Sequence, residues 1–348
     1  MSRSAALAGR VLAIVPCLDE EANIERVVGR LLDDEAVGII VVADGGSSDG
    51  TRSIVAQLAA HSDRVELLDN PDRIQSTAVN RAVARHGDDY RWLVRVDAHC
   101  AYPANYVSCL LSAAERAASQ SVVVSMETIA GEGFSAGAAA AQNSRLGTGG
   151  SAHRASDRSG YVDHGHHAMM EVEAFRRAGG YCENMPCNED AELDVRLRRQ
   201  GSRIWLEPSA MIGYYPRGTP AALFRQYYRY GIGRATTVRR HREKMRARQI
   251  LPLLIAPCVG ALFLSPLAAF VHSLLAAALA LPALAWAGLC QGWGVKLAFE
   301  QRRADVLYAG TAAMIMHFAW SLGFWRQLVE AFLRPAASGS EPLLPFSG

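Results

Sequence analysis

Apolar runs alternate with segments of helical spacing over residues 11–97. Four runs predict buried strands, each followed by a residue that interrupts it: 11–15 before Pro16, 39–43 before Asp44, 65–68 before Asn70, and 92–96 before Asp97. The segments between the runs predict helices, at 20–32, 51–60 and 77–85. This βαβαβαβ order predicts a parallel sheet with right-handed crossovers. Because ligands bind beyond the carboxyl ends of such strands, we expect the interrupting residues to gather at one site.

The pattern is less regular beyond residue 100. Residues 122–126 form another apolar run typical of a buried strand, whereas 131–160 are rich in Gly, Ala and Ser and predict loop with one short helix. A strand and then a helix are predicted within 168–175. The helical spacing of 191–200 ends at Gly201, and 204–206 predict a short strand. These elements extend the predicted α/β domain to about residue 215.

Residues 250–290 contain no Lys, Arg, Asp or Glu. About 20 apolar residues cross a bilayer, so this stretch predicts a hairpin of two spans, about 250–268 and 270–290, that turns near Ser265 and Pro266. A buried pair of soluble helices is the alternative. Residues 306–325 predict a third span in which His317 is the most polar member, and an interfacial helix is the alternative there.

Charge defines the flanks of this hairpin. Between Arg217 and Arg248 the chain has ten Lys or Arg and one acid, Glu243, and the polar segment 296–305 follows the hairpin. Basic residues beside membrane spans stay in the cytoplasm, so both flanks are expected there. A solvated basic helix is the alternative interpretation. Nucleic-acid binding is disfavoured because the basic run adjoins an apolar segment rather than forming a module of its own.

The net charge of +2 and the mean hydropathy of +0.04 conceal this division of the 348 residues. The seven cysteines have no Cys-x-x-Cys pair or zinc-site spacing, so reduced thiols are expected, and the first ten residues lack the apolar core of a signal peptide. Four regions are predicted: a cytosolic α/β domain at 1–215, a basic amphipathic interfacial segment at 216–249, membrane helices at 250–330 and a flexible tail at 331–348.

Three acidic positions stand where chemistry is expected. Asp44 precedes two glycines, and its carboxylate there can accept hydrogen bonds from a uracil N–H or a ribose hydroxyl; a plain Asp-Gly turn is the alternative. Asp97 and His99, two residues apart at a strand end, can both reach one Mn²⁺ or Mg²⁺ ion between phosphates, unless the histidine is structural. Asp190 opens a helix and can act as a general base toward an acceptor hydroxyl. An acid at a helix start is also simply stabilising, which applies most to Glu189.

Two further motifs are candidates for substrate contact. In Gln226-Tyr-Tyr-Arg229-Tyr230 the arginine can hold a diphosphate and Tyr230 can pack on an acceptor sugar, although the segment also fits an amphipathic interfacial helix. The run Asp163-His-Gly-His-His167 has the composition of a metal cluster but lacks the i,i+4 histidine pair of a zincin. We expect its histidines to line an acceptor pocket, with structural roles as the alternative: His164, His166 and His167.

These motifs together resemble glycosyltransferase family 2, whose members have the GT-A fold, a mixed sheet with flanking helices. The matching strings are Pro16-Cys-Leu-Asp-Glu20, Asp44-Gly-Gly-Ser-Ser-Asp-Gly-Thr51, Asp97-Ala-His99, Asn188-Glu-Asp190 and Gln226-x-x-Arg229-Tyr230. Other strings resemble the succinoglycan-synthesis glucosyltransferase subfamily: 69–71, Arg73-Ile-Gln75, Arg95-Val-Asp-Ala-His99, 141–145 and 163–167. The resemblance covers about 10–245 and continues as a similar membrane tail.

The resemblance implies an inverting transfer with direct displacement. Asp190 would deprotonate the acceptor while UDP departs with the help of a divalent metal on Asp97 and His99. UDP-glucose is the implied donor, and a polyprenyl-diphosphate-linked saccharide at the bacterial inner membrane is the implied acceptor. The catalytic domain would face the cytoplasm and build an exopolysaccharide repeat unit. The implied nucleotide and substrate contacts are Pro16, Leu18, Glu20, Asp44, Gly45, Ser47, Arg73, Gln75, Asp97, Glu189, Gln226, Arg229 and Tyr230.

Two departures from the broad family pattern narrow the prediction. His99 stands in place of a second aspartate, and Tyr230 in place of a tryptophan. With so few spans, the tyrosine favours addition of a single sugar over a processive synthase. A polyprenyl-phosphate sugar synthase and a catalytically dead membrane scaffold remain as alternatives, although a dead scaffold is expected to have lost Asp97 or Asp190. A nucleotidyltransferase is disfavoured because Pro16-Cys-Leu-Asp-Glu20 replaces the Gly-rich basic loop expected after its first strand.

Overall fold

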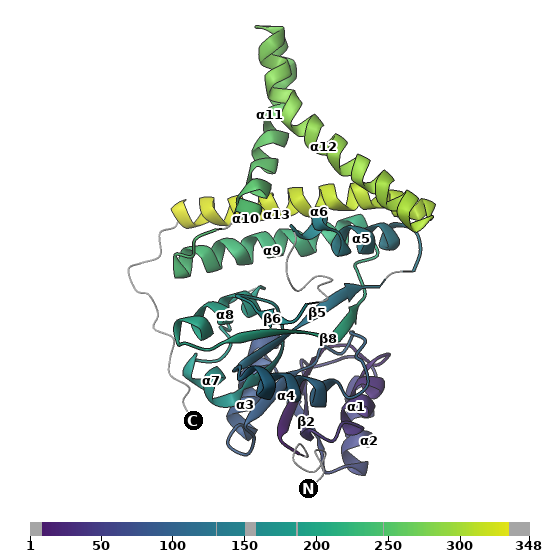
Figure 1. The fold of residues 1–348 in the computed structure, drawn as a ribbon, viewed down its shortest axis with the longest axis vertical. Helices are drawn as coiled ribbons and strands as arrows, with labels where there is room; N and C mark the ends of the chain where they lie inside the picture. The colour runs from purple at the N-terminus through teal and green to yellow at the C-terminus, as the bar shows by residue number, and fades with distance from the viewer. Residues whose placement is uncertain (1–8, 130, 150–157, 186, 246, 334–348) are drawn as a thin grey trace.

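A computed structural model describes residues 9–129, 131–149, 158–185, 187–245 and 247–333 (Figure 1). Eight strands form one sheet in the order β3-β2-β1-β4-β7-β5-β8-β6. The strands are β1 (Val11–Cys17), β2 (Val37–Asp44), β3 (Val65–Asp69), β4 (Trp92–Arg95), β5 (Ser121–Thr128), β6 (Gly160–Tyr161), β7 (His166–Glu171) and β8 (Ile204–Tyr214). The helices that flank the sheet are α1 (Ile24–Leu32), α2 (Thr51–His61), α3 (Gln75–His86), α4 (Tyr106–Ala117), α7 (Val172–Arg177) and α8 (Glu189–Arg199).

The sheet is mixed, and one antiparallel strand determines what meets at its edge. The predicted parallel pairing of β1 to β4 is confirmed, and β5 and β8 also pair in parallel. Strand β7 runs antiparallel to both β4 and β5. Its register with β4 pairs Trp92 with Glu171 and Val94 with Met169, and continuing that register sets Asp97 opposite His166. The amino end of β7 therefore lies at the edge where the parallel strands end.

Apolar residues cover both faces of the sheet. In β1, Val11, Ala13 and Val15 pack with α1 and α4, whereas Leu12 and Ile14 pack with α3, α7 and α8 on the opposite face. This alternation follows from the period of two residues in a strand. Because helices cover both faces, the strands read as unbroken apolar runs, and the polar site is confined to the sheet edge.

Above the sheet domain the structure is helical, and two pairs of long helices are arranged differently there (Figure 1). Helix α9 (Pro220–His241) and helix α13 (Tyr308–Leu333) lie side by side above the sheet domain, while α11 (Ile255–Ala269) and α12 (Ser273–Gln301) project away as a hairpin. The shorter elements are α5 (Phe134–Asn143), α6 (Arg145–Thr148), α10 (Ala247–Ile250), η1 (Leu251–Leu254) and η2 (Ala304–Leu307).

Glycines allow α9 and α13 to pack closely. A Cβ atom on Gly231 would lie 2.1 Å from the carbonyl oxygen of Trp320, and one on Gly323 would lie 2.1 Å from that of Tyr228. These backbones approach so closely only because both positions lack side chains. The pair therefore forms a fixed layer above the carboxyl edge of the sheet.

Several sequence predictions need correction. Helix α11 continues through Pro266, and the hairpin turns at residues 270–272, where the His272 ring accepts a hydrogen bond from the Leu274 N–H. Proline is tolerated there because the Leu262 carbonyl, which Pro266 leaves without its usual N–H donor, accepts a hydrogen bond from the Ser265 hydroxyl at 2.8 Å. The segment predicted as loop with one short helix contains both α5 and α6. Helix α4 was not predicted, and β8 extends far beyond 204–206. The predicted tail lies outside the described residues from 334 onward.

Candidate active site

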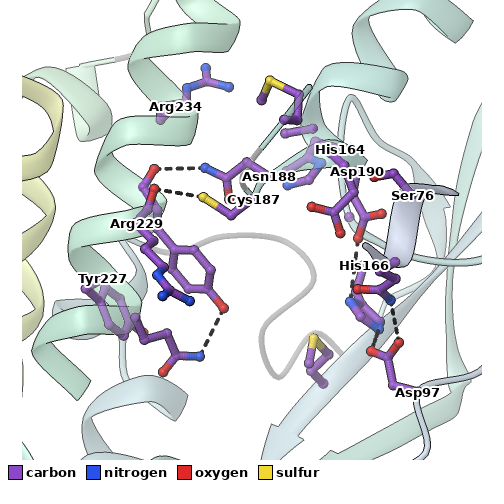
Figure 2. A pocket seen from close by; sticks show the side chains of 18 of the residues that line it. Ser76, Asp97, His164, His166, Cys187, Asn188, Asp190, Tyr227, Arg229 and Arg234 are labelled. Atoms are coloured by element: carbon purple, nitrogen blue, oxygen red, sulfur yellow. Dashed lines mark hydrogen bonds and ion pairs between the residues drawn. The ribbon is translucent and has the colours of Figure 1, made fainter. Parts of the chain in front are cut away.

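A cavity of about 2030 Å³ lies between the carboxyl edge of the sheet and α9. Figure 2 shows Asp97, His166 and Asp190 on one wall, facing Tyr227, Arg229 and Arg234 of α9. The structure brings most of the predicted residues to this cavity: Pro16, Leu18, Glu20, Gly45, Arg73, Gln75, Asp97, His99, His164, His166, Glu189, Asp190, Gln226, Arg229 and Tyr230. Asp44 and Ser47 are not among its lining residues, and the side chain of His167 lies outside what the structure describes.

Asp190 is held by a buried arginine that was not among the predicted site residues. The Nη1 atom of Arg95 lies 2.6 Å from Asp190 Oδ1 and its Nη2 atom 3.1 Å from Oδ2, a bidentate pair. The Tyr181 hydroxyl also donates to Asp190 Oδ1, at 2.9 Å. Burial opposes the charge of Arg95, but Asp190 and its neighbours raise the arginine's pKa well above its ordinary value. A charged residue inside the apolar run 92–96 was the available sequence signal.

Asp97 lies just beyond β4, as predicted. Its Oδ1 atom accepts a hydrogen bond from Gln75 Nε2 at 2.8 Å, and its Oδ2 atom lies 3.7 Å from His166 Nε2 (Figure 2). His166 also approaches Asp190, with its Nδ1 atom 3.9 Å from Oδ2. The carboxylates predicted for the metal and for the base are therefore linked through one imidazole, which the antiparallel strand β7 delivers.

His99 and Asp97 have different partners in this structure. The Nδ1 atom of His99 lies 3.1 Å from Glu20 Oε1. This hydrogen bond raises the pKa of His99 despite burial, while the pKa of Glu20, raised by burial, is lowered overall by His99 and Asn23. The geometry thus favours an ion pair between His99 and Glu20 at the cavity wall.

Asp44 organises the loop behind the cavity. Its side chain is fully buried and accepts hydrogen bonds from the backbone N–H groups of Gly46 and Ser47, from the Ser47 hydroxyl and from Arg52 Nη1. Burial raises the pKa of Asp44, but these hydrogen bonds lower it overall. The direct nucleoside contact remains a prediction; what the structure shows is a carboxylate that shapes the Gly45–Gly46 turn at the cavity.

The Gln226–Tyr230 motif contacts the loop before Asp190 through backbone carbonyls. The thiol of Cys187 donates to the Arg229 oxygen and the amide of Asn188 donates to the Tyr230 oxygen, both at 2.8 Å (Figure 2). Gln226 Nε2 donates to the Tyr230 hydroxyl at 3.0 Å. Asn188 adopts a left-handed conformation with φ of 61° and begins α8. The motif therefore fixes the position of Asp190 relative to α9.

Gly233 is the closest point of this contact and gives a testable prediction. A Cβ atom there would lie 2.6 Å from the Cys187 carbonyl oxygen and 3.0 Å from Asn188 Nδ2. We expect Gly233→Ala to displace the loop and lower kcat by about 10²-fold, since small misplacements of a catalytic group are costly. Turnover and thermal unfolding would be measured beside Gly29→Ala, a helical glycine of α1 with open space around it. Normal turnover in Gly233→Ala would contradict the prediction.

The acceptor-side histidines differ in their settings. His164 lies at the cavity, with its Nδ1 atom 2.7 Å from Oδ2 of Asp194, a fully buried carboxylate of α8. Asp194 lies one helical turn beyond Asp190, so α8 positions both the candidate base and the partner of His164. Among the described residues no three His, Cys, Asp or Glu side chains form a group that could hold a metal ion.

Comparisons with known proteins identify the family of this chain. A family model described as "Glycosyl transferase family 2" matches residues 12–179, and one described as "Glycosyl transferase family group 2" matches 96–290. The succinoglycan biosynthesis protein ExoA of Rhizobium meliloti (strain 1021) is 45% identical over 322 residues, which cover 92% of this chain and 95% of that protein.

The fold has a counterpart among solved structures. The mannosyltransferase PcManGT from Pyrobaculum calidifontis, solved in complex with GDP-Man and Mn²⁺, matches with a TM-score of 0.55 and 20% identity, covering 93% of this chain and 88% of that one. This likeness concerns the fold, which is the predicted GT-A sheet with flanking helices. With a 45% identical relative across nearly its whole length, the chain belongs to glycosyltransferase family 2 and is a glycosyltransferase.

Proposed function

We propose that this enzyme transfers one sugar, glucose from UDP-glucose, to a saccharide carried on a polyprenyl diphosphate lipid, in assembly of a succinoglycan-type exopolysaccharide repeat unit. The observation that carries the proposal is the single cavity lined by Asp97, Asp190 and Arg229. It supplies a carboxylate for a donor metal, a carboxylate for the acceptor proton and a cation for a diphosphate. The relative named for succinoglycan biosynthesis supports the pathway.

The donor is assigned to the edge of β1 and β2. Pro16, Leu18, Gly45 and Arg73 line the cavity there, and a Cβ atom on Gly45 would lie 3.4 Å from the Cys17 carbonyl oxygen. The absence of a side chain at Gly45 lets a nucleoside approach the backbone. Arg73, from the segment between β3 and α3, and Arg229, from α9, both line the cavity and provide positive charge for the diphosphate.

The residues at the sheet edge fit a divalent cation that is shared with the donor. Such cations are commonly held by one or two carboxylates together with substrate phosphates, which Asp97 can satisfy without a three-residue cluster. Asp97 is the proposed protein ligand, and the pairing of His99 with Glu20 leaves His99 a charge-bearing role instead. When bound, Mn²⁺ or Mg²⁺ would stabilise the negative charge that develops on the departing UDP.

The acceptor is assigned to the side of Asp190. Its carboxylate is partly exposed to the cavity at the start of α8, where the helix dipole favours the ionised form. We assign it as the general base that takes the hydroxyl proton while the acceptor oxygen attacks the anomeric carbon from the face opposite UDP. In-line displacement inverts that carbon and yields a β-linked sugar. His164, His166 and Tyr230 line the same cavity and would contact the acceptor saccharide.

The direct test is a donor screen. Detergent-extracted enzyme would be supplied with several nucleoside diphosphate sugars and lipid-linked acceptors, with UDP release and product mass as readouts. UDP-glucose is expected to give one added hexose per acceptor. A polymer, or a sugar linked straight to polyprenyl phosphate, would instead identify one of the alternative enzymes.

The membrane region supports a lipid-borne acceptor. Three helices are long and apolar enough to cross a bilayer: residues 251–269, 273–301 and 304–333. In the first two helices, 0% and 11% of the residues of the 18-residue apolar stretch are buried, whereas in the third helix 50% of them are buried. In that third helix His317 Nε2 contacts the Leu146 carbonyl of α6 at 2.8 Å, so α13 packs on a helix that precedes the apolar hairpin in the chain. We therefore propose that α11 and α12 form the membrane hairpin and that α13 lies at the inner surface of the membrane.

Cysteine labelling tests this topology. In a cysteine-free background, Val271→Cys at the hairpin tip is expected to react with an impermeant maleimide added to intact cells or spheroplasts. Glu330→Cys on α13 is expected to react only after permeabilisation, as is the control Glu25→Cys on α1. The reason is that two crossings return the chain to the cytoplasm, whereas three would leave Glu330 outside. Labelling of Glu330→Cys in intact cells would show that α13 crosses.

A further inference from the structure

The candidate base and the candidate metal ligand share one buried cation. Arg95 is 2% exposed and directs three nitrogens at three carboxylates. Its Nη1 and Nη2 atoms bind Asp190, its Nε atom lies 3.6 Å from Asp97 Oδ1, and Nη1 also lies 3.6 Å from Glu189 Oε1. Such a group is costly to bury unless its charge is matched. One guanidinium group therefore faces three acidic side chains, among them the candidate base and the candidate metal ligand.

Without this arginine the three carboxylates would repel one another. Burial and the nearby Asp190 charge already raise the pKa of Glu189. Asp190 is faced by Arg95 from β4, His166 from β7, Tyr181 from the loop before α8, and Glu189 from α8 itself. Of these, only Arg95 is a permanent cation, because guanidinium stays protonated across the working pH range. Its bidentate pairing therefore favours the ionised form of Asp190.

We propose that Arg95 is a positioning residue that holds Asp190 ionised and oriented toward the acceptor and couples it to the donor-side carboxylate Asp97. The inference rests on the proposed role of Asp190 as the base. The bidentate pair fixes the plane of the carboxylate, and Tyr181 adds a third hydrogen bond to the same Oδ1 atom. When a divalent cation occupies Asp97, the surplus negative charge around Arg95 falls, which ties assembly of the donor site to the setting of the base.

The arrangement also limits the strength of the base. A carboxylate paired with arginine binds a proton more weakly, so this pairing favours a base that accepts the proton late, as bond breaking at the anomeric carbon proceeds. Removing Arg95 reverses this balance. Asp190 would then lose this cation while Glu189 stays beside it, and the base would be protonated over more of the working range.

The test is the pH dependence of kcat in Arg95→Met. The acid limb is expected to move to higher pH by about 1–3 units, the shift that an opposite charge at this distance causes. At neutral pH kcat is expected to fall by about 10²-fold or more. The KM for the UDP-sugar should change less than kcat, because Asp97 lies at the longer contact of 3.6 Å.

Two further variants separate charge from geometry. Arg95→Lys keeps a cation but cannot bind both oxygens in a planar fork, so its acid limb should stay near that of the wild type while kcat falls. Tyr181→Phe removes one neutral hydrogen bond and should shift the acid limb by less than Arg95→Met does. Arg91→Met is the matched control, since Arg91 precedes the same strand but is largely exposed and pairs with Glu171.

The outcomes are distinct. UDP binding by calorimetry shows whether each variant is folded, and if Arg95→Met does not fold, Arg95→Lys and Tyr181→Phe decide the question. An unmoved acid limb in a folded Arg95→Met, together with an inactive Asp190→Asn, would overturn the role of Arg95 alone. An active Asp190→Asn would instead show that the base assignment in the proposed function is wrong.

Discussion

Asp190→Asn is expected to abolish sugar transfer while UDP binding survives. The amide has nearly the shape of the carboxylate and stands at the same cavity wall, but it cannot accept a proton. The loss in kcat should be about 10²–10⁴-fold, the usual contribution of a general base. The amide also leaves Arg95 without its bidentate partner, which adds to the loss because a buried arginine then lacks part of its compensation.

The measurement combines UDP release in the presence of a lipid-linked acceptor with UDP binding by calorimetry. Glu183→Gln is a suitable control, because Glu183 is an exposed acid that also lines the cavity and contacts Asn80. The control should retain near-normal turnover. Near-normal turnover of Asp190→Asn itself would remove Asp190 from the reaction and leave the acceptor without its assigned base.

Asp97→Ala is expected to remove the metal-dependent part of donor binding and most of the transfer activity. Asp97 is the cavity carboxylate at the end of β4, held by Gln75 and placed opposite His166. With the carboxylate gone, Mn²⁺ or Mg²⁺ would have lost its proposed protein ligand. UDP affinity measured with metal should then fall at least tenfold, about 1.4 kcal/mol, to the value measured with EDTA.

Calorimetry with and without Mn²⁺ would measure this difference. Asp72→Ala serves as the control, because Asp72 forms a half-exposed ion pair with Arg81 and is not among the residues that line the cavity. If Asp97→Ala kept the full enhancement of UDP binding by metal, the metal role of Asp97 would be disproved. The same titration on His99→Ala would show how much His99 contributes, for which the ion pair with Glu20 predicts a smaller effect than that of Asp97→Ala.

Much of the candidate site was predictable because it depends on where strands end. An apolar run followed by Pro16, Asp44 or Asp97 identifies the strand ends locally, and parallel strands end at one edge of a sheet. The helix that begins near Asp190 was also predictable, from the helical spacing of the apolar residues in 191–200. What such reasoning missed is the antiparallel direction of β7, a strand predicted within 168–175, because that direction depends on its neighbours in the sheet. That direction is what brings His166 between Asp97 and Asp190.

For the apolar helices after residue 250, too, local sequence predicts some features and tertiary contacts decide others. The uncharged length of 250–290 predicts two spans because the cost of burying charge in lipid depends only on local sequence. The composition of α13 suits both a membrane span and an interfacial helix, so the local sequence cannot distinguish between them. Its glycine contacts with α9 and the contact of His317 with α6 place it against these two helices.

The sequence by itself determined the order of the elements, the residues at the strand ends, the apolar hairpin and the family. These features follow from hydrophobic periodicity and short motifs, which act over a few residues. Only the tertiary structure decided that Arg95 pairs with Asp190, that His99 pairs with Glu20 and that Asp44 is buried in its own loop. Each of these pairings depends on which charge lies nearest in space, and except in the Asp44 loop those charges come from distant parts of the chain.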